Sequence, residues 1–159
     1  MALKLLILGL PGSGKSSMAR YIATYLEYKN WESTRYSDHV ILQNMFHTDS
    51  EGTQFRSADH GGFDILDLNV FDIALQMLEQ NVNQYLLSAK QEELVLIEFS
   101  RNDYHRAFQQ FSDKFLQDAH FLHLDVDTET CKKRVRERID KPITEDDFFV
   151  SEFIFTNYY

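Results

Sequence analysis

The hydrophobic pattern of the chain alternates between short apolar runs and longer segments in which apolar residues recur at helical spacing. The runs predict strands that are covered on both faces, because a half-exposed strand would alternate apolar and polar positions. These strands are expected at 3–8, 94–99 and 121–126, with a brief further strand at 34–37. The helical segments are 16–28, 40–46, 67–90, 104–116 and 128–139. Strands separated by such helices predict an α/β fold with a parallel sheet and right-handed crossovers.

Composition indicates that residues 1–159 fold as a single domain. The length suits one domain, and no internal repeat or linker divides the chain. Six glycines and two prolines exclude collagen and low-complexity disorder, and the one cysteine, Cys131, excludes a disulfide scaffold. A lone cysteine also favours a reducing compartment, so we expect a cytoplasmic protein in which Cys131 packs in the core.

Charge and hydropathy argue against two classes of partner. The chain has 16 basic and 25 acidic residues, a formal net charge of −9, whereas nucleic-acid binding favours a basic surface. No apolar run approaches the roughly 18 residues that a membrane-spanning helix needs. The apolar start is followed by Pro11-Gly12-Ser13-Gly14 rather than by a signal-peptide cleavage site, so we interpret it as a strand. We expect neither a nucleic-acid nor a membrane partner.

Half of the glycines lie directly after the first predicted strand. They belong to Gly9-Leu10-Pro11-Gly12-Ser13-Gly14-Lys15-Ser16, which fits the pattern G-x-x-x-x-G-K-[ST]. Such glycines let successive backbone N–H groups point into one concavity that binds phosphate, and the following helix directs its positive N-terminus there. Lys15 is expected to reach the β- and γ-phosphates, and the Ser16 hydroxyl to bind Mg²⁺. The predicted nucleotide-binding residues are Gly9, Pro11, Gly12, Ser13, Gly14, Lys15, Ser16 and Ser17.

With this loop between a strand and a helix, the sequence resembles the P-loop NTPase superfamily, and within it the adenylate-kinase-like small kinases that phosphorylate nucleotides, nucleosides and other metabolites. The resemblance is specific over 3–26 and diffuse elsewhere. It implies a three-layer α/β/α fold with a mostly parallel sheet of about five strands, which binds ATP and Mg²⁺ at the strand ends. The Asn-Lys-x-Asp motif of switch GTPases and the Ser-Gly-Gly signature of transporter ATPases are absent.

Two acidic residues suit the remaining needs of phosphoryl transfer, which are a carboxylate near Mg²⁺ and a group that orients the attacking oxygen. Glu98 ends an apolar strand, and Arg101 follows three residues later. Asp38 ends the brief second strand, where kinases that the chain resembles place their catalytic base. Helix capping is the alternative for each carboxylate. We expect Lys15, Asp38, Glu98 and Arg101 to be catalytic and Ser16 with Glu98 to bind the metal, and either carboxylate could be the base.

The basic segment near the C-terminus is the expected source of further catalytic arginines. Arg134 and Arg138 are four residues apart and share one helix face, whereas Arg136 points away. In the kinases that the chain resembles, a lid in this region carries arginines that stabilise charge on the transferred group, so 128–147 is a candidate lid. The alternative is a solvated basic helix face.

The polar segment 48–67 is the candidate acceptor-binding insert, because related kinases have a mobile insert at this point. Arg56 suits a phosphate or carboxylate, and Phe63 could stack on a base. Asp38 and Arg101 are the other residues that we expect to bind the acceptor. The strand end Glu98-Phe99-Ser100-Arg101 matches neither the Asp-Gly-Phe-Pro-Arg of adenylate-kinase-like enzymes nor the Glu-Arg-Ser of deoxynucleoside kinases, so the acceptor stays open.

The last twelve residues hold a cluster of six aromatic residues and at most one further helix or strand, expected at 150–155. Kinases of the type that the chain resembles have a fifth strand and a closing helix at this point. Either the adenine wall is minimal or a partner subunit completes it, and an exposed aromatic cluster would favour a homodimer.

The leading functional hypothesis is an ATP-binding phosphotransferase that moves the γ-phosphate to a small, nucleotide-like or hydroxylated acceptor. The alternative is a nucleotide-binding regulatory or assembly module with weak NTP hydrolysis. A polynucleotide kinase is a third option, which the net charge disfavours. Zinc chemistry is not expected, because there is one cysteine and the histidines are scattered.

Overall fold

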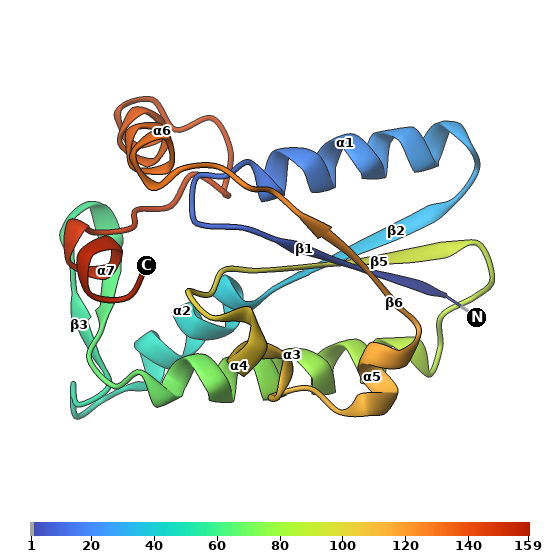
Figure 1. The fold of residues 1–159 in the computed structure, drawn as a ribbon, viewed down its shortest axis with the longest axis horizontal. Helices are drawn as coiled ribbons and strands as arrows, with labels where there is room; N and C mark the ends of the chain where they lie inside the picture. Colours follow the sequence, from blue (N-terminus) through green and yellow to red (C-terminus); the bar gives the residue numbers. More distant parts are fainter. Residues whose placement is uncertain (1) are drawn as a thin grey trace.

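A computed structural model describes residues 2–159, and its centre is a four-stranded parallel sheet (Figure 1). The strand order is β2-β5-β1-β6, so β1 lies between two strands that follow it much later in the chain. The strands are β1 (Leu3–Leu8), β2 (Glu32–Ser37), β5 (Glu93–Phe99) and β6 (Ala119–His123). The predicted parallel sheet is confirmed, with four strands among the described residues where about five were expected.

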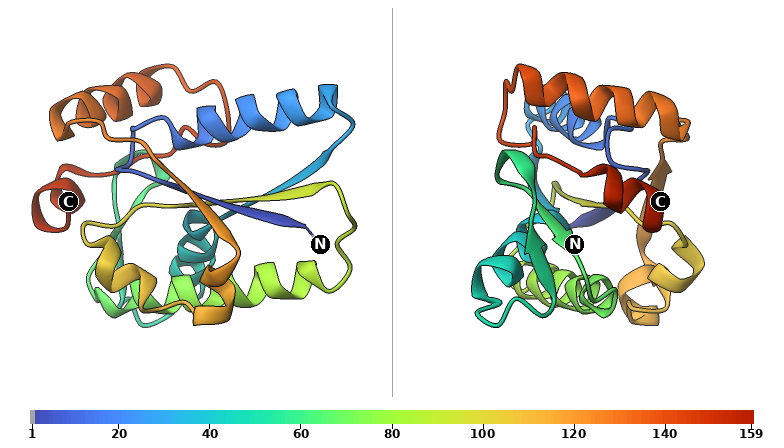
Figure 2. Two further views of the ribbon diagram at one scale, coloured as in Figure 1. Left: turned by 45° about the vertical axis from the view of Figure 1, so that its right-hand side comes forward. Right: turned by 90° about the vertical axis from the view of Figure 1, so that its left-hand side faces the viewer.

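Helices cover both faces of this sheet and make the predicted three-layer fold. On one side lie α1 (Lys15–Tyr28) and α6 (Thr128–Asp140), as Figures 1 and 2 show. On the other side lie α2 (Asp38–Thr48), α3 (Asn69–Leu86), α4 (Tyr104–Phe108) and α5 (Asp113–Gln117). Because both faces are covered, the middle of the central strands is buried: Leu6, Ile7, Leu96 and Ile97 have no exposed surface.

Two segments differ from their predicted structure. The segment expected as one helix at 104–116 forms α4 and α5, because Ser112 leaves the helical path. Its backbone N–H and hydroxyl both donate to the carboxylate of Glu79 on α3, and its hydroxyl accepts from the N–H of Phe115 to start α5. The polar segment expected as a loop contains an antiparallel hairpin of β3 (Phe55–Ser57) and β4 (Phe63–Ile65), joined by a 3-10 turn at Asp59–Gly61.

The hairpin and the last helix, α7 (Glu152–Asn157), lie side by side at the carboxyl ends of the sheet strands (Figure 2). Asp64 of β4 joins them, because its buried carboxylate accepts a hydrogen bond from the hydroxyl of Ser151. That hydroxyl also accepts from the N–H of Ile154 and so caps α7. The hairpin is therefore fixed to the body at the edge of the sheet where ligands bind in open α/β folds.

Most of the aromatic cluster at the C-terminus packs inside the chain. Phe155 is 4% exposed, and the Tyr158 ring stacks on Phe71 of α3 with centroids 4.0 Å apart. Phe153, at 40%, is the aromatic residue that α7 exposes most. Homodimer formation through this cluster stays a prediction. No helix of residues 2–159 is both long and apolar enough to cross a membrane.

Candidate active site

The glycine-rich loop between β1 and α1 has the backbone that its sequence predicts. Gly12 has φ of 83°, which disfavours any side chain. A Cβ at Gly12 would also lie 2.5 Å from the carbonyl oxygen of Cys131, because α6 packs directly on the loop. Cys131 is fully buried, and its thiol donates to the carbonyl oxygen of Val126 at 3.7 Å. Glycine at position 12 therefore lets α6 approach the loop.

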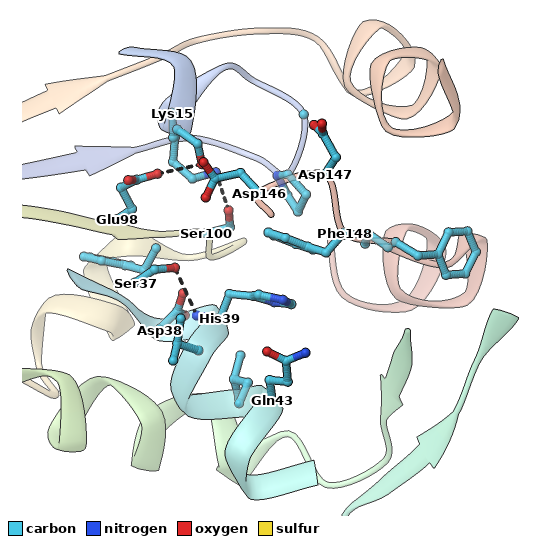
Figure 3. Close-up of a pocket in the computed structure, with 18 of the residues that line it drawn as sticks. Lys15, Ser37, Asp38, His39, Gln43, Glu98, Ser100, Asp146, Asp147 and Phe148 are labelled. Carbon is cyan, nitrogen blue, oxygen red and sulfur yellow. Dashed lines mark hydrogen bonds between the residues drawn. The ribbon is translucent and has the colours of Figure 1, made fainter. Parts of the chain in front are cut away.

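The side chain of Lys15 bonds back to the loop that precedes it. Its Nζ donates to the carbonyl oxygens of Gly9 and Leu10, both at 2.9 Å, and to the hydroxyl of Ser100 at 2.6 Å (Figure 3). Burial lowers the pKa of Lys15 to about 8, although the carboxylates of Asp38 and Glu98 oppose this shift. The ammonium is thus held at the loop by acceptors that a phosphate group would replace.

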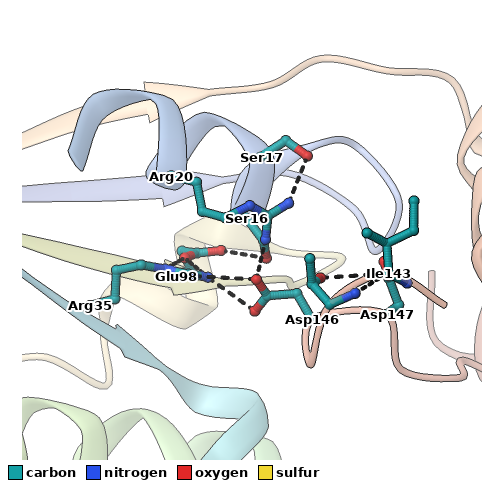
Figure 4. A network of polar contacts seen from close by, with 9 residues as sticks. Ser16, Ser17, Arg20, Arg35, Glu98, Ile143, Asp146 and Asp147 are labelled. Carbon is teal, nitrogen blue, oxygen red and sulfur yellow. Dashed lines mark hydrogen bonds and ion pairs between the residues drawn. The ribbon is translucent and has the colours of Figure 1, made fainter. Parts of the chain in front are cut away.

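The second residue of α1, Ser16, contacts the carboxylate predicted to share its role. Its hydroxyl donates to Oε2 of Glu98 at 2.9 Å, and Glu98 is 2% exposed. The other carboxylate oxygen accepts from Arg35 of β2 at 2.7 Å. Arg35 also pairs with Asp146, which a second arginine, Arg20 of α1, contacts from the other side (Figure 4). Glu98 therefore lies at the centre of a polar network that joins the loop to the segment after α6.

The donor set of Ser16 and Glu98 fits Mg²⁺. Both offer hard oxygen ligands side by side at the loop, and Mg²⁺ is usually held by one or two protein groups together with phosphate and water. No group of three or more His, Cys, Asp or Glu side chains within 2–159 forms a site that could hold a metal alone. The geometry thus suits an ion that arrives with a nucleotide.

Asp38 forms a buried ion pair with Arg101. Asp38 begins α2 directly after β2, Arg101 follows β5, and the two side chains are 7% and 3% exposed. Nη1 of Arg101 donates to Asp38 and, at 2.6 Å, to the carbonyl oxygen of Ser100, and Nη2 donates to that of Phe71 at 2.7 Å. The guanidinium also stacks over the Phe71 ring, 4.8 Å from its centroid. These contacts fix the position of the Asp38 carboxylate.

One cavity of about 500 Å³ connects these groups. Its P-loop side is lined by Pro11, Gly12 and 14–17, together with Arg134 and Arg138 of α6. Its α2 side is lined by residues of α2, β4, α3 and the end of β5, namely Asp38, His39, Gln43, Phe63, Phe71 and Arg101. Glu98 lies between the two sides, and Figure 3 shows Lys15 and Asp38 facing each other across this space.

The segment after α6 lines the cavity with residues 145–150, and it contacts one of the arginines predicted to be catalytic. Nη1 of Arg134 donates to the carbonyl oxygen of Gly12 at 3.4 Å. Arg138 donates from Nε and Nη2 to the carbonyl oxygen of Phe148, at 3.0 and 2.6 Å. Arg136 instead pairs with Glu152, away from the cavity, so the three arginines are oriented as their spacing predicts.

Phe148 continues from this segment into the cavity. Its ring stacks on that of His39, with centroids 3.5 Å apart, and His39 in turn stacks on Phe63. Burial lowers the pKa of His39 to about 4, so its imidazole is neutral at pH 7. The rings form the apolar lining between α2 and the segment after α6.

Two groups of predicted residues lie outside the cavity lining. Arg56 does not line the cavity: it pairs with Asp64 at 2.6 Å and lies over the ring of Phe153. Gly9 and Ser13 lie behind the loop, where the Gly9 N–H donates to the Tyr104 hydroxyl at 2.7 Å and the buried Ser13 hydroxyl has no partner among the described residues. The other predicted residues of the loop line the cavity, and so does Phe63.

Sequence reasoning missed Arg20, Arg35, His39 and Asp146. Arg35 carried a signal, because a charged side chain within a predicted strand needs a partner when the strand is covered. His39 follows Asp38 directly and could have been considered with it. Asp146 lies in a polar segment where one acid looks like its neighbours, so only the fold reveals its role.

The β1–loop–α1 unit, the parallel sheet and the cavity at its carboxyl edge define a P-loop NTPase with a kinase-like fold. The model of a protein family described as "AAA domain" matches residues 5–154, so the chain belongs to that family. No curated protein matches the sequence.

Several solved structures have a similar fold, and among them are two kinases and one further protein with a bound nucleotide. The Mycobacterium tuberculosis APS kinase CysC, in complex with AMPPNP and APS, is 21% identical with a TM-score of 0.55, covering 89% of this chain and 73% of that chain. Chaetomium thermophilum Kti12 in complex with ADP-AlF3 is 16% identical with a TM-score of 0.57, covering 97% of this chain and 77% of that chain. Acinetobacter baumannii shikimate kinase in complex with shikimate is 15% identical with a TM-score of 0.50, covering 92% of this chain and 70% of that chain. At these identities the likeness concerns the fold.

Proposed function

We propose that the protein is an ATP-dependent phosphotransferase that moves the γ-phosphate of ATP to a hydroxyl group of a small acceptor. The observation that carries this proposal is the cavity itself, because it joins the P-loop to a fixed carboxylate, Asp38, on the opposite side. The apolar compartment beyond the P-loop offers room for an acceptor beside the triphosphate. The kinase-like fold of the similar structures agrees with this proposal.

In the proposed reaction the P-loop amides and Lys15 bind the triphosphate, and Ser16 with Glu98 would hold Mg²⁺, which neutralises phosphate charge when bound. The acceptor oxygen forms a bond to the γ-phosphorus, and the bond from this phosphorus to the bridging oxygen of ADP breaks. Asp38 takes the acceptor proton, since Glu98 is already bound to Ser16. Arg134 and Arg138 stabilise the charge of the transferred group from the α6 side.

Arg101 acts in this proposal as a positioning residue. Its donors are engaged by Asp38 and by two backbone carbonyl oxygens, so it orients the base rather than contacting the transferred phosphate. The lone buried thiol, which stays free in a reducing compartment, favours the cytoplasm as the place of reaction.

A transfer assay tests the proposal. Labelled ATP is incubated with the protein and a panel of nucleosides, nucleotides, sugars and other alcohols, and the labelled products are separated from ATP and free phosphate. We expect acceptor-dependent product with the wild-type chain and at least about 10²-fold less with Lys15→Ala. Lys90→Ala is the matched control, because Lys90 is an exposed lysine at the opposite end of the sheet.

The alternative, a regulatory or assembly module with weak hydrolysis, has one observation in its favour. Both candidate carboxylates are paired with arginines, Glu98 with Arg35 and Asp38 with Arg101. If the protein bound ATP and released free phosphate at a rate that no acceptor changed, this alternative would replace the phosphotransferase proposal.

A further inference from the structure

The two sides of the cavity differ in the cations that a ligand can reach. On the P-loop side, Lys15 is held only by neutral oxygen acceptors, and Arg134 and Arg138 donate only to backbone carbonyl oxygens. These three side chains are therefore available to the charged phosphates of a nucleotide. On the α2 side, the cavity lining has one cation, Arg101.

Arg101 is not available to an anionic ligand. Its two Nη atoms are engaged by Asp38, Ser100 and Phe71, and its Nε is buried with no exposed surface. The side chain is 3% exposed, so a ligand could reach its donors only by breaking the ion pair with Asp38. Breaking a buried ion pair is strongly destabilising.

Arg138 of α6 borders the α2 side, where its guanidinium lies 4.7 Å from the centroid of the Phe148 ring that stacks on His39. The other basic side chains near the α2 side carry no free charge there. His39 is neutral at pH 7, because burial lowers its pKa to about 4. Arg56 is paired with Asp64, outside the cavity. Three carboxylates of the segment after α6 also line the cavity. Asp146 is paired with Arg20 and Arg35, whereas Glu145 and Asp147 have no ion pair among the described residues and would repel an anion.

We infer that the acceptor is an uncharged, hydroxyl-bearing organic molecule rather than a phosphorylated or carboxylated one. This inference rests on the proposed phosphotransferase function and specifies its acceptor. An anionic group on the α2 side would lose its hydration without gaining a free cation, whereas a neutral group loses little. The net charge of the Asp38–Arg101 pair is zero, so the pair neither attracts nor needs a charged acceptor. Its carboxylate can still accept the proton of an acceptor hydroxyl.

The remaining lining fits such a molecule. Phe63, Phe71 and Ile154 offer apolar surface, and Gln43 projects from α2 into the same space with an amide that both donates and accepts hydrogen bonds (Figure 3). Sites of this kind bind neutral ligands through apolar contact with a few polar groups that set orientation. A nucleoside or another neutral alcohol has this chemistry, and its phosphate ester does not.

The test compares matched pairs of acceptors in the presence of ATP: four nucleosides with their 5′-monophosphates, and neutral sugars with their sugar phosphates. We expect the kcat/KM of the best neutral acceptor to exceed that of its phosphorylated partner at least about tenfold, because an unpaired buried charge costs more than a lost neutral hydrogen bond. Preference for the phosphorylated member of the pair would overturn the inference and leave the phosphotransferase proposal standing. Acceptor-independent phosphate release, with ATP bound, would overturn the phosphotransferase proposal and the inference that rests on it.

A charge variant gives a second readout that does not depend on loss of activity. Gln43 is exposed on α2, so Gln43→Arg adds a free cation to the α2 side without disturbing the core. We expect Gln43→Arg to shift the ratio of kcat/KM toward the phosphorylated partner at least about tenfold, and Gln43→Leu to leave that ratio nearly unchanged. Equal ratios in both variants, measured together with ATP affinity to show an intact P-loop side, would contradict the inference.

Discussion

On the P-loop side of the cavity, the loop is one continuous segment, in which Lys15 bonds to the carbonyl oxygens of Gly9 and Leu10, and Ser100, Glu98 and α6 contact it from outside. On the α2 side, the contacts join elements that are far apart in the chain, such as the Asp38–Arg101 pair, whose residues follow β2 and β5. The backbone of the loop needs only a strand, a turn and a helix to form. The α2 side needs the whole fold, so we expect substitutions there to affect stability as well as activity.

The largest expected effect is the loss of stability in Arg101→Met. Removing one partner of a buried ion pair leaves the Asp38 carboxylate uncompensated, which typically costs about 3–5 kcal/mol. Urea denaturation of the purified variant measures this loss. The double variant Asp38→Asn/Arg101→Met removes both charges and should regain most of the stability while remaining inactive. Equal stability of the single and double variants would show that the pair does not hold the α2 side together.

The next largest effect is expected on activity, with little change in stability. Lys15→Ala should lower phosphoryl transfer about 10²–10³-fold, the usual loss when one electrostatic contact to a transition state is removed. Its free energy of unfolding should change little, because the wild-type ammonium is desolvated and bound only by neutral oxygens. Steady-state kinetics beside urea denaturation separate the two quantities. A large loss of stability in Lys15→Ala would contradict the expectation that only the α2 side affects both stability and activity.

A pair of glycine variants sharpens the contrast within the P-loop side. Both Gly12 and Gly14 have positive φ, but a Cβ at Gly14 meets no atom within 4 Å, whereas one at Gly12 meets the Cys131 carbonyl oxygen. Gly14→Ala therefore carries only backbone strain, about 1–2 kcal/mol. Gly12→Ala adds a steric clash with α6, and we expect it to lose about 1–3 kcal/mol more. Thermal unfolding of the two proteins measures the difference, and equal losses would mean that α6 does not press on the loop.

The smallest effect at neutral pH is expected from His39→Phe, which keeps a flat ring between Phe63 and Phe148. At pH 7 the cost should stay below about 1.5 kcal/mol, as for other volume-conserving changes. In the wild-type protein the folded-state pKa of His39, about 4, lies below its ordinary value of 6.5. The unfolded chain therefore binds more protons between these values, and stability falls as the pH drops from 6.5 toward 4. His39→Phe should flatten that part of the stability profile, which urea midpoints at successive pH values record.

The same contrast explains which parts of the fold and of the site could be predicted from the sequence alone. Gly9–Ser16 and the end of the Glu93–Phe99 strand were predictable because each is a local pattern, and parallel strands bring their carboxyl ends to one edge. Arg134 and Arg138 were predictable in orientation because helix geometry fixes which residues share a face.

What could not be predicted depends on pairing between distant residues. Arg35 and Asp146 are 111 positions apart, and no local pattern indicates that they meet. Arg56 shows the same dependence on pairing: its chemistry suits an acceptor anion, and the register of the β3–β4 hairpin sets it opposite Asp64, with which it forms an ion pair. The break of the 104–116 helix likewise depends on Glu79, a residue of another helix.

The close packing of α6 on the P-loop has a practical consequence for following the protein in solution. Cys131 is the one thiol of the chain, it is fully buried, and its carbonyl group lies beside Gly12. A thiol reagent can therefore react only when the segments packed around Cys131, which include Phe155 of α7, move away from α6, so the alkylation rate measures the opening of this region. Nucleotides that close the site should lower the alkylation rate of Cys131. The wild-type chain needs no added label for this measurement.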